Sequence, residues 1–221
     1  MNTLTLNNVS YTYPGGTSPV VKAASYGFET GKLYAIVGPS GSGKSTLLSM
    51  LAGLDAPGEG DVVLGENNLK SLDMDRYRRE GVSIIFQAFC LLPLLTVREN
   101  VCLPMEMQSI PENQARVRAA EALVKVGIEE SKHKRFPSAL SGGEQQRVAI
   151  ARSLASGAKT LLADEPTGNL DAANTVNVIR ILGQLAHEQG YCVIVVTHDP
   201  EVAELADQVY RVKDGVLTEA K

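Results

Sequence analysis

The chain has 221 residues, 44% of them hydrophobic, which is enough to bury the core of one domain, and its net charge of -4 argues against a nucleic-acid-binding protein. Its three cysteines, Cys90, Cys102 and Cys192, have no CxxC spacing, so we expect reduced thiols rather than disulfides. No apolar run approaches the roughly 18 to 20 residues that cross a bilayer, and the N-terminus lacks the basic and apolar regions of a secretory signal, so we expect a cytoplasmic protein.

The N-terminal part of the chain predicts strands of two kinds. Thr3 to Val9 alternates apolar and polar residues, and Gly58 to Leu64 has a similar pattern, so both indicate antiparallel strands. Lys32 to Val37 is a short apolar strand, after which leucines recur at helical spacing from Leu47 to Leu54.

Later segments predict a buried parallel sheet. Val82 to Phe86, Thr160 to Ala163 and Tyr191 to Thr197 are continuous apolar runs, as expected of strands covered on both faces. Between the first two, residues 88–157 show helical patterns such as Glu112 to Val126 but no comparable strand, which indicates a helical insertion.

These elements together predict an α/β fold. We expect a mainly parallel sheet, an N-terminal antiparallel β subdomain and an inserted helical subdomain at about residues 88–157. No internal repeat, low-complexity tract or long linker divides the sequence, so we expect residues 1–221 to form a single domain.

The segment GPSGSGKST, Gly38 to Thr46, has the pattern of a phosphate-binding loop. It follows a predicted strand and opens a predicted helix, whose free N–H groups and positive dipole end attract anions. We expect its backbone to wrap the β-phosphate, Lys44 to bridge the β- and γ-phosphates, and the Ser45 hydroxyl to ligate magnesium. The expected nucleotide-binding residues of this segment are Gly38, Ser40, Gly41, Ser42, Gly43, Lys44, Ser45 and Thr46.

A second glycine-rich segment, LSGGEQQR, predicts another helix N-terminus. Ser141 and Glu144 have the spacing of a capping box, so the motif by itself indicates a plain helix cap as readily as a binding site. The consecutive glycines Gly142 and Gly143 would let a foreign phosphate approach the backbone, and a phosphate-binding loop exists elsewhere in the chain. We therefore expect Ser141, Gly142, Gly143 and Glu144 to contact a nucleotide.

Polar residues follow the predicted buried strands. Asp164 and Glu165 end one strand, Gln87 a second and His198 a third. Acidic turns and single histidines are usually structural, but open α/β sheets bind ligands at the carboxyl ends of their strands. Because neighbouring residues on a strand point to opposite sides, we expect Asp164 to face magnesium and Glu165 to face the attacking water as general base. Gln87 is expected to reach magnesium or that water.

These motifs resemble, in order and spacing over nearly the whole chain, the nucleotide-binding subunit of ATP-binding cassette (ABC) transporters. In this resemblance the motifs are Walker A at Gly38 to Thr46, the Q-loop at Gln87, the signature at Leu140 to Gln145, Walker B ending in Asp164 and Glu165, the D-loop at Asn169 to Asp171, and the H-loop at His198.

The resemblance implies a P-loop (RecA-like) ATPase core that uses ATP and Mg²⁺. It implies Glu165, His198 and Gln87 as catalytic residues and Ser45, Gln87 and Asp164 as the metal-binding set. Tyr13 matches the aromatic residue that stacks on adenine, with Tyr11 as the less favoured alternative.

At finer grain the segments FQAFCLLPLLTVRENV and ADEPTGNLD resemble the branch with macrolide exporters, lipoprotein-release ATPases and bacitracin-type peptide-resistance pumps. Glu144 departs from the commoner glutamine of the family's LSGGQ signature, and AANT follows Asp171 where related ATPases often have serine and lysine. Neither departure removes a catalytic group.

The resemblance also implies partners. Two chains would close head to tail around two ATP molecules, with the Walker A loop of each facing the signature of the other. The dimer would drive a separate transmembrane permease, contacted through about Ala88 to Val101, from the inner face of the membrane, in export or in extraction from the membrane. Cargo contacts would lie in that permease.

Two other classes share the motifs. A mechanotransmission ATPase of the cell-division kind would signal through a membrane partner without transport, and the sequence leaves this alternative open. Chromosome-maintenance and DNA-repair ATPases usually place coiled coils or zinc modules between cradle and signature, and this chain has neither heptads nor CxxC pairs there.

Overall fold

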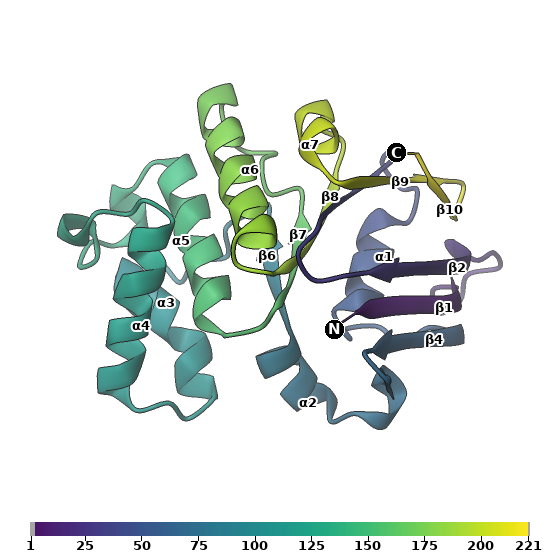
Figure 1. Ribbon diagram of the computed structural model, residues 1–221, viewed down its shortest axis with the longest axis horizontal. Coiled ribbons are helices and arrows are strands. Elements are labelled where there is room, and N and C mark those ends of the chain that lie inside the picture. The colour runs from purple at the N-terminus through teal and green to yellow at the C-terminus, as the bar shows by residue number, and fades with distance from the viewer. Residues whose placement is uncertain (1–2, 221) are drawn as a thin grey trace.

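A computed structural model describes residues 3–220 and contains two β-sheets with helices around them (Figure 1). The larger sheet has six strands, in the spatial order β10 (Val216–Glu219), β9 (Gln208–Lys213), β3 (Leu33–Val37), β8 (Cys192–Thr197), β7 (Thr160–Asp164) and β6 (Val82–Phe86). All neighbouring pairs from β9 to β6 are parallel, and β10 alone runs antiparallel to its neighbour. The carboxyl ends of β3, β6, β7 and β8 therefore share one edge.

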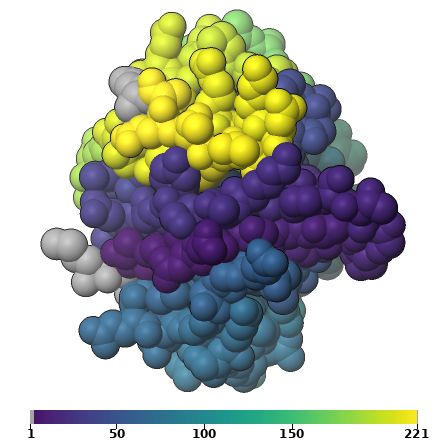
Figure 2. Space-filling model, turned by 90° about the vertical axis from the view of Figure 1, so that its right-hand side faces the viewer, coloured from purple at the N-terminus to yellow at the C-terminus, as the bar shows by residue number. Residues whose placement is uncertain are grey.

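The smaller sheet is antiparallel. Its order is β2 (Val21–Phe28), β1 (Leu4–Tyr11), β4 (Glu59–Leu64) and β5 (Asn67–Asn68). In Figure 2 its purple N-terminal strands cross the molecule between the yellow C-terminal hairpin and the blue segment around β4. Hydrogen bonds from the Lys22 N–H to the Gly215 carbonyl, 2.8 Å, and from the Tyr26 hydroxyl to the Leu217 carbonyl, 2.9 Å, join the two sheets.

Helices flank both sheets. They are α1 (Lys44–Leu51), α2 (Met74–Arg76), α3 (Val97–Met107), α4 (Glu112–Lys125), α5 (Gly142–Ala155), α6 (Ala172–His187) and α7 (Pro200–Leu205), with short 3-10 or π turns at Leu69–Ser71, Tyr77–Gly81, Glu130–Lys132 and Pro137–Ala139. Figure 1 shows α3, α4 and α5 grouped at the end of the molecule opposite the small sheet.

The buried side chains form two clusters on opposite faces of the large sheet. Along β3, Tyr34 and Ile36 pack with α1 and the small sheet, whereas Leu33 and Ala35 pack with the helices that follow later in the chain. This alternation is what a strand covered on both faces requires.

The α/β fold with a mainly parallel sheet and an N-terminal antiparallel sheet is confirmed. The predicted parallel strands begin and end within one residue of β3, β6, β7 and β8. The sequence analysis gave no range for β2, where alanines and a glycine replace the usual branched residues and Ala23 adopts a positive φ of 46°, and none for β9 and β10, which form a hairpin.

Candidate functional site

The phosphate-binding loop connects β3 to α1. Gly43, the residue before the helix, has a φ of +104°, and a β-carbon there would lie 2.6 Å from the Val20 carbonyl oxygen, so only glycine fits. Lys44 is buried, and its ammonium donates to the carbonyl oxygens of Gly38 and Pro39 at 2.9 and 3.0 Å. The cation thus lies over its own loop, where a polyphosphate would also lie.

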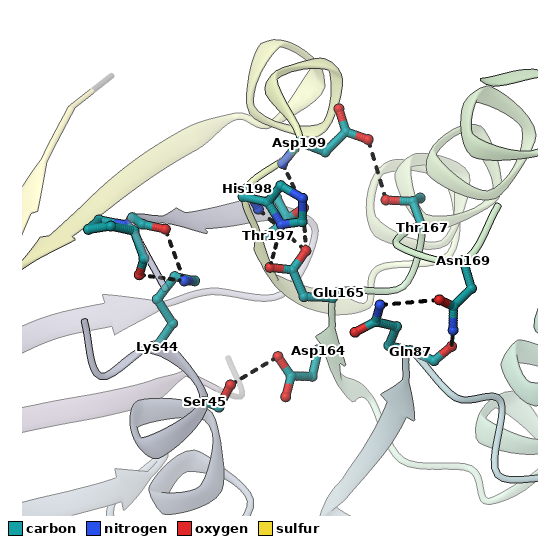
Figure 3. A network of polar contacts seen from close by, with 12 residues as sticks. Lys44, Ser45, Gln87, Asp164, Glu165, Thr167, Asn169, Thr197, His198 and Asp199 are labelled. Carbon is teal, nitrogen blue, oxygen red and sulfur yellow. Dashed lines mark hydrogen bonds and ion pairs between the residues drawn. The ribbon is translucent and has the colours of Figure 1, made fainter. Parts of the chain in front are cut away.

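A cleft of about 1040 Å³ opens beside this loop. The predicted residues that line it are Tyr13, Gly38, Ser40, Gly41, Gly43, Lys44, Ser45, Thr46, Gln87, Asp164, Glu165 and His198. In Figure 3 the side chains of Lys44, Ser45, Gln87, Asp164, Glu165 and His198 lie around one space. Ser42 is buried, and its hydroxyl has no hydrogen-bond partner among the described residues.

Ser45 and Asp164 come together as a pair of oxygen ligands. The Ser45 hydroxyl donates to Asp164 Oδ1 at 3.3 Å, and burial raises the pKa of the Asp164 carboxyl above its ordinary value. Residues 3–220 contain no cluster of three or more histidine, cysteine or acidic side chains that could hold a metal by itself. A hydroxyl and one carboxylate beside a phosphate-binding loop nevertheless fit Mg²⁺, which commonly takes few protein ligands and completes its shell with phosphates and water.

Glu165 lies just past the end of β7, not on it. Its φ is +47°, so the alternation of a strand does not set its direction as the sequence analysis assumed. Its carboxylate accepts from the Thr197 hydroxyl at 3.1 Å and the His198 N–H at 3.4 Å, and lies 2.9 Å from His198 Nδ1 (Figure 3). A carboxylate in a left-handed backbone held by three groups is the kind of strained arrangement that clusters at functional sites.

Gln87 faces the D-loop. Its side-chain amide donates to Asn169 Oδ1 at 3.3 Å, and the Asn169 amide donates to the Gln87 carbonyl at 3.0 Å. Two hydrogen bonds, one to the Asn169 side chain and one to the Gln87 backbone carbonyl, therefore link the end of β6 to the D-loop at the edge of the cleft (Figure 3).

Tyr13 and Thr46 lie at the other end of the cleft. Their hydroxyl oxygens are 2.6 Å apart, Tyr13 is 48% exposed, and the Tyr11 and Tyr13 rings pack in a T-shaped arrangement. The Tyr11 hydroxyl instead donates to Asp55 Oδ1 at 3.3 Å. This arrangement favours Tyr13 over Tyr11 as the surface for a nucleobase.

The segment Ser141 to Glu144 forms the N-terminus of α5, with the predicted capping box present. Ser141 Oγ accepts from the Glu144 N–H at 3.4 Å, and Glu144 Oε2 accepts from the Ser141 N–H at 2.9 Å. The Lys132 ammonium contacts Glu144 Oε1 at 2.6 Å, and these partners lower the pKa of the Glu144 carboxyl to about 2. None of Ser141, Gly142, Gly143 and Glu144 lines the cleft beside the phosphate-binding loop of the same chain.

The two glycines of this segment differ. Gly143 is buried, and a β-carbon there would collide with the Asn174 side chain of α6, whereas Gly142 is half-buried and has room for one. A side chain at Gly143 would therefore have to displace Asn174, so packing inside the chain favours glycine there, a reason that the sequence analysis did not consider.

Known proteins resemble this chain along nearly its whole length. A profile of the family described as "ABC transporter" matches residues 21–168. The chain belongs to the ABC transporter family. The lipoprotein-releasing system ATP-binding protein LolD 2 of Rhodopirellula baltica is 44% identical over 208 residues, 90% of this chain and 81% of that protein. The macrolide export ATP-binding/permease protein MacB of Shigella flexneri is 42% identical over 219 residues, 97% of this chain and 34% of that protein.

A solved ABC transporter cassette has the same fold. The dimeric structure of MJ0796, a protein of Methanocaldococcus jannaschii, superposes with a TM-score of 0.88 at 39% identity, covering 99% of this chain and 98% of that one. Another structure of MJ0796 is a dimeric post-hydrolysis state bound to ADP and Pi. The chain is therefore an ATP-binding ABC ATPase, related to export-type members, and the expected branch is confirmed.

Some contacts of this ABC ATPase site had no sequence signal. Thr197 and Asn169 hold Glu165 and Gln87, and Lys132 pairs with Glu144 across a loop. Cys102 and Cys192 are buried free thiols as expected, whereas Cys90 is exposed and lines the nucleotide cleft. No helix in the described part of the chain combines the length and apolarity that a membrane span requires.

Proposed function

We propose that two copies of this chain close head to tail around two ATP molecules, each bound by the Walker A loop of one chain and the signature of the other. The observation that carries the proposal is the division of the motifs within one chain. The cleft contains the Walker A loop and the strand-end residues, while Ser141 lies exposed at the N-terminus of α5 and outside that cleft. A helix N-terminus with exposed donors is suited to bind a phosphate that another chain presents.

The chemistry follows from the residues of the cleft. Ser45, Asp164 and Gln87 would hold Mg²⁺, which when bound offsets the charge that develops on the transferred phosphate. Lys44 would leave the Gly38 and Pro39 carbonyls for the β- and γ-phosphates, an exchange of neutral acceptors for charged ones. Glu165 would take a proton from the attacking water, because three hydrogen-bonding groups hold its carboxylate in position.

His198 is proposed as the group that positions Glu165. Its Nδ1 contacts the carboxylate, while its side chain is 74% exposed on the open side of the cleft. An exposed imidazole at that place can also reach the γ-phosphate when the cleft is occupied. Tyr13 would stack on adenine, and Thr46 would contact the α-phosphate.

We further propose that a separate transmembrane permease docks on the chain near the helical group. A groove of about 420 Å³ lies between the core and these helices, and its lining includes Leu54, Phe86 and Met107, all exposed apolar side chains. The predicted contact region Ala88 to Val101 does not line this groove but begins two residues after Phe86, and it exposes Leu94. Residues 1–221 would then act as one ABC domain with a helical subdomain at about 88–157, at the inner face of a membrane, in export or extraction.

The shared-site proposal is tested by assembly. Purified Glu165→Gln protein should be monomeric without nucleotide and dimeric with ATP, because slow hydrolysis preserves the γ-phosphate that joins the two chains. Adding Ser141→Arg should abolish the dimer, since the larger side chain would occupy the place of that phosphate. Light scattering after size-exclusion chromatography measures both outcomes.

The control must separate loss of the cap from loss of the binding site. The capping box of Thr96 and Glu99 at α3 has the same reciprocal bonds, so Thr96→Arg in the Glu165→Gln background removes an equivalent cap. That variant should still dimerise. A dimer that persists with Ser141→Arg, in a protein that circular dichroism shows folded, contradicts the proposal, as does Glu165→Gln protein that stays monomeric with saturating ATP.

A further inference from the structure

The Glu144 carboxylate divides its two oxygens between the signature and a cation outside it. Oε2 accepts from the N–H and the hydroxyl of Ser141, at 2.9 and 3.0 Å. Oε1 is 2.6 Å from the ammonium of Lys132, and the side chains of Lys132 and Glu144 are only 27% and 17% exposed. The ion pair is therefore partly shielded from water, where charges act on one another more strongly than at an open surface.

Lys132 is held in place by the loop between α4 and α5. Its own N–H donates to the Glu129 carbonyl in a short turn, and the next residue, His133, is buried with Nε2 3.2 Å from the Ile128 carbonyl. The His133 carbonyl in turn accepts from the Arg98 N–H of α3. The loop thus presents the lysine to the N-terminus of α5 from a fixed position.

A carboxylate at this helix N-terminus opposes the function proposed for it. It is ionised at neutral pH and hydrogen-bonded to the serine expected to contact a phosphate, so it adds a negative charge where an anion must approach. The carboxylate also accepts a hydrogen bond from the Ser141 hydroxyl. A serine hydroxyl has one proton, so while it donates to Glu144 it cannot donate to a phosphate. A cation on the opposite carboxylate oxygen reduces both effects, because it cancels the charge and weakens the carboxylate as an acceptor.

We infer that Lys132 is a positioning residue of the signature, whose ammonium neutralises Glu144 so that the N-terminus of α5 can accept the γ-phosphate of an ATP molecule held by a second copy of this chain. The inference rests on the shared-site proposal. A lysine that only stabilised the loop would affect folding but would have no specific relation to the charge of Glu144.

The test compares ATP-driven dimerisation among variants that all carry Glu165→Gln. Lys132→Met should weaken the dimer about tenfold at each shared site, hence about a hundredfold in the dissociation constant of a dimer with two sites, as expected for one uncompensated charge several ångströms from a phosphate. Adding Glu144→Gln should restore the parent value, because glutamine keeps the capping box without the charge. Lys134→Met removes the same charge from an exposed position of the same loop and should have no effect.

Sedimentation velocity over a protein dilution series with saturating ATP measures the dissociation constants, and binding of a fluorescent ATP analogue to dilute monomer should be equal in all variants. The loss caused by Lys132→Met should shrink as salt is raised. A Lys132→Met dimer as tight as the parent, or a loss that Glu144→Gln does not restore, overturns the inference and leaves the shared site standing. A parent protein that never dimerises with ATP overturns the shared-site proposal and the inference together.

Discussion

The N-termini of α1 and α5 both carry glycine-rich motifs, for which we propose phosphate binding, but side chains cap the two helices differently. No side chain caps α1, and the residue before it, Gly43, is in the left-handed region. In α5 the reciprocal bonds of Ser141 and Glu144 form a complete cap. The first helix therefore has no capping side chain at its N-terminus, whereas in the second the N–H groups of Ser141 and Glu144 are paired within the chain.

The difference matches where the two helices lie. The start of α1 is enclosed in a cleft with a buried lysine, so an uncapped end is protected there until a nucleotide binds. Ser141 is exposed, and in the free chain an uncapped helix end there would fray in water. A cap keeps α5 ordered while it has no partner, and the Ser141 hydroxyl can exchange its contact with Glu144 for one with a phosphate. Substitutions at the N-terminus of α1 should thus change ATP binding by a single chain. Substitutions at the N-terminus of α5 should change the association of two chains.

The largest effect is expected at a residue that belongs to neither helix. Glu165→Gln keeps the shape of the side chain but cannot act as a base, so turnover should fall by about a hundredfold to ten-thousandfold. ATP affinity should stay close to that of the parent, because neither helix N-terminus is altered. Phosphate release and equilibrium ATP binding, measured on the same preparation, decide this. Near-normal turnover would remove Glu165 from the role of base, and lost binding would give it a structural role.

A smaller effect distinguishes the two helix N-termini directly. Lys44→Ala should lower the ATP affinity of the monomer by about 10- to 100-fold, because the loop loses a charge-assisted contact to the phosphates. Ser141→Arg should leave the same affinity unchanged, since the signature lies outside that cleft. Isothermal titration at protein concentrations below those of dimerisation compares the two. Equal losses of ATP affinity in both variants would mean that one chain binds the same nucleotide with both helices. That result would contradict the proposal that only α1 binds the nucleotide of its own chain.

Sequence reasoning located the strand ends and both helix N-termini because each depends on local patterns. The loop at Gly38 and the cap at Ser141 are both short-range features, and each lies where it was expected. The order of the six strands depends on contacts between segments that are distant in the sequence. The buried apolar runs, with the rule that ligands bind at the carboxyl ends of such strands, were still enough to predict that Gln87, Glu165 and His198 lie in one cleft.

What the sequence could not supply were contacts between distant side chains and departures from regular backbone. The left-handed φ of Glu165 cannot be read from a strand pattern, since the strand ends one residue earlier. The approach of Asn174 to Gly143 and the pairing of Lys132 with Glu144 depend on how loops cross between elements. Both of these contacts involve the signature, so packing within the chain accounts for part of a motif that the sequence explained only by a helix cap or by ligand binding.

The smallest expected effect is on folding stability, and it tests whether the charge of Glu144 stabilises the N-terminus of α5. The first turn of α1 has no acidic residue that could act in this way. The folded-state pKa of Glu144 is lowered from 4.5 to about 2, so the unfolded chain takes up this proton first as the pH falls. The stabilisation from the ionised carboxylate is therefore complete above about pH 4.5 and is lost as the pH falls toward 2.

At pH 7 the parent should be more stable than Glu144→Gln by about 1 kcal/mol, the range of a partly shielded charged hydrogen bond. That difference should shrink at pH 3, whereas Glu121→Gln at an exposed position of α4 should change stability at neither pH. Urea unfolding at pH 7, 5 and 3 measures the three proteins. A difference between parent and Glu144→Gln that is independent of pH would mean that the glutamate stabilises α5 through its shape alone, and the two helix N-termini would then differ in capping but not in charge.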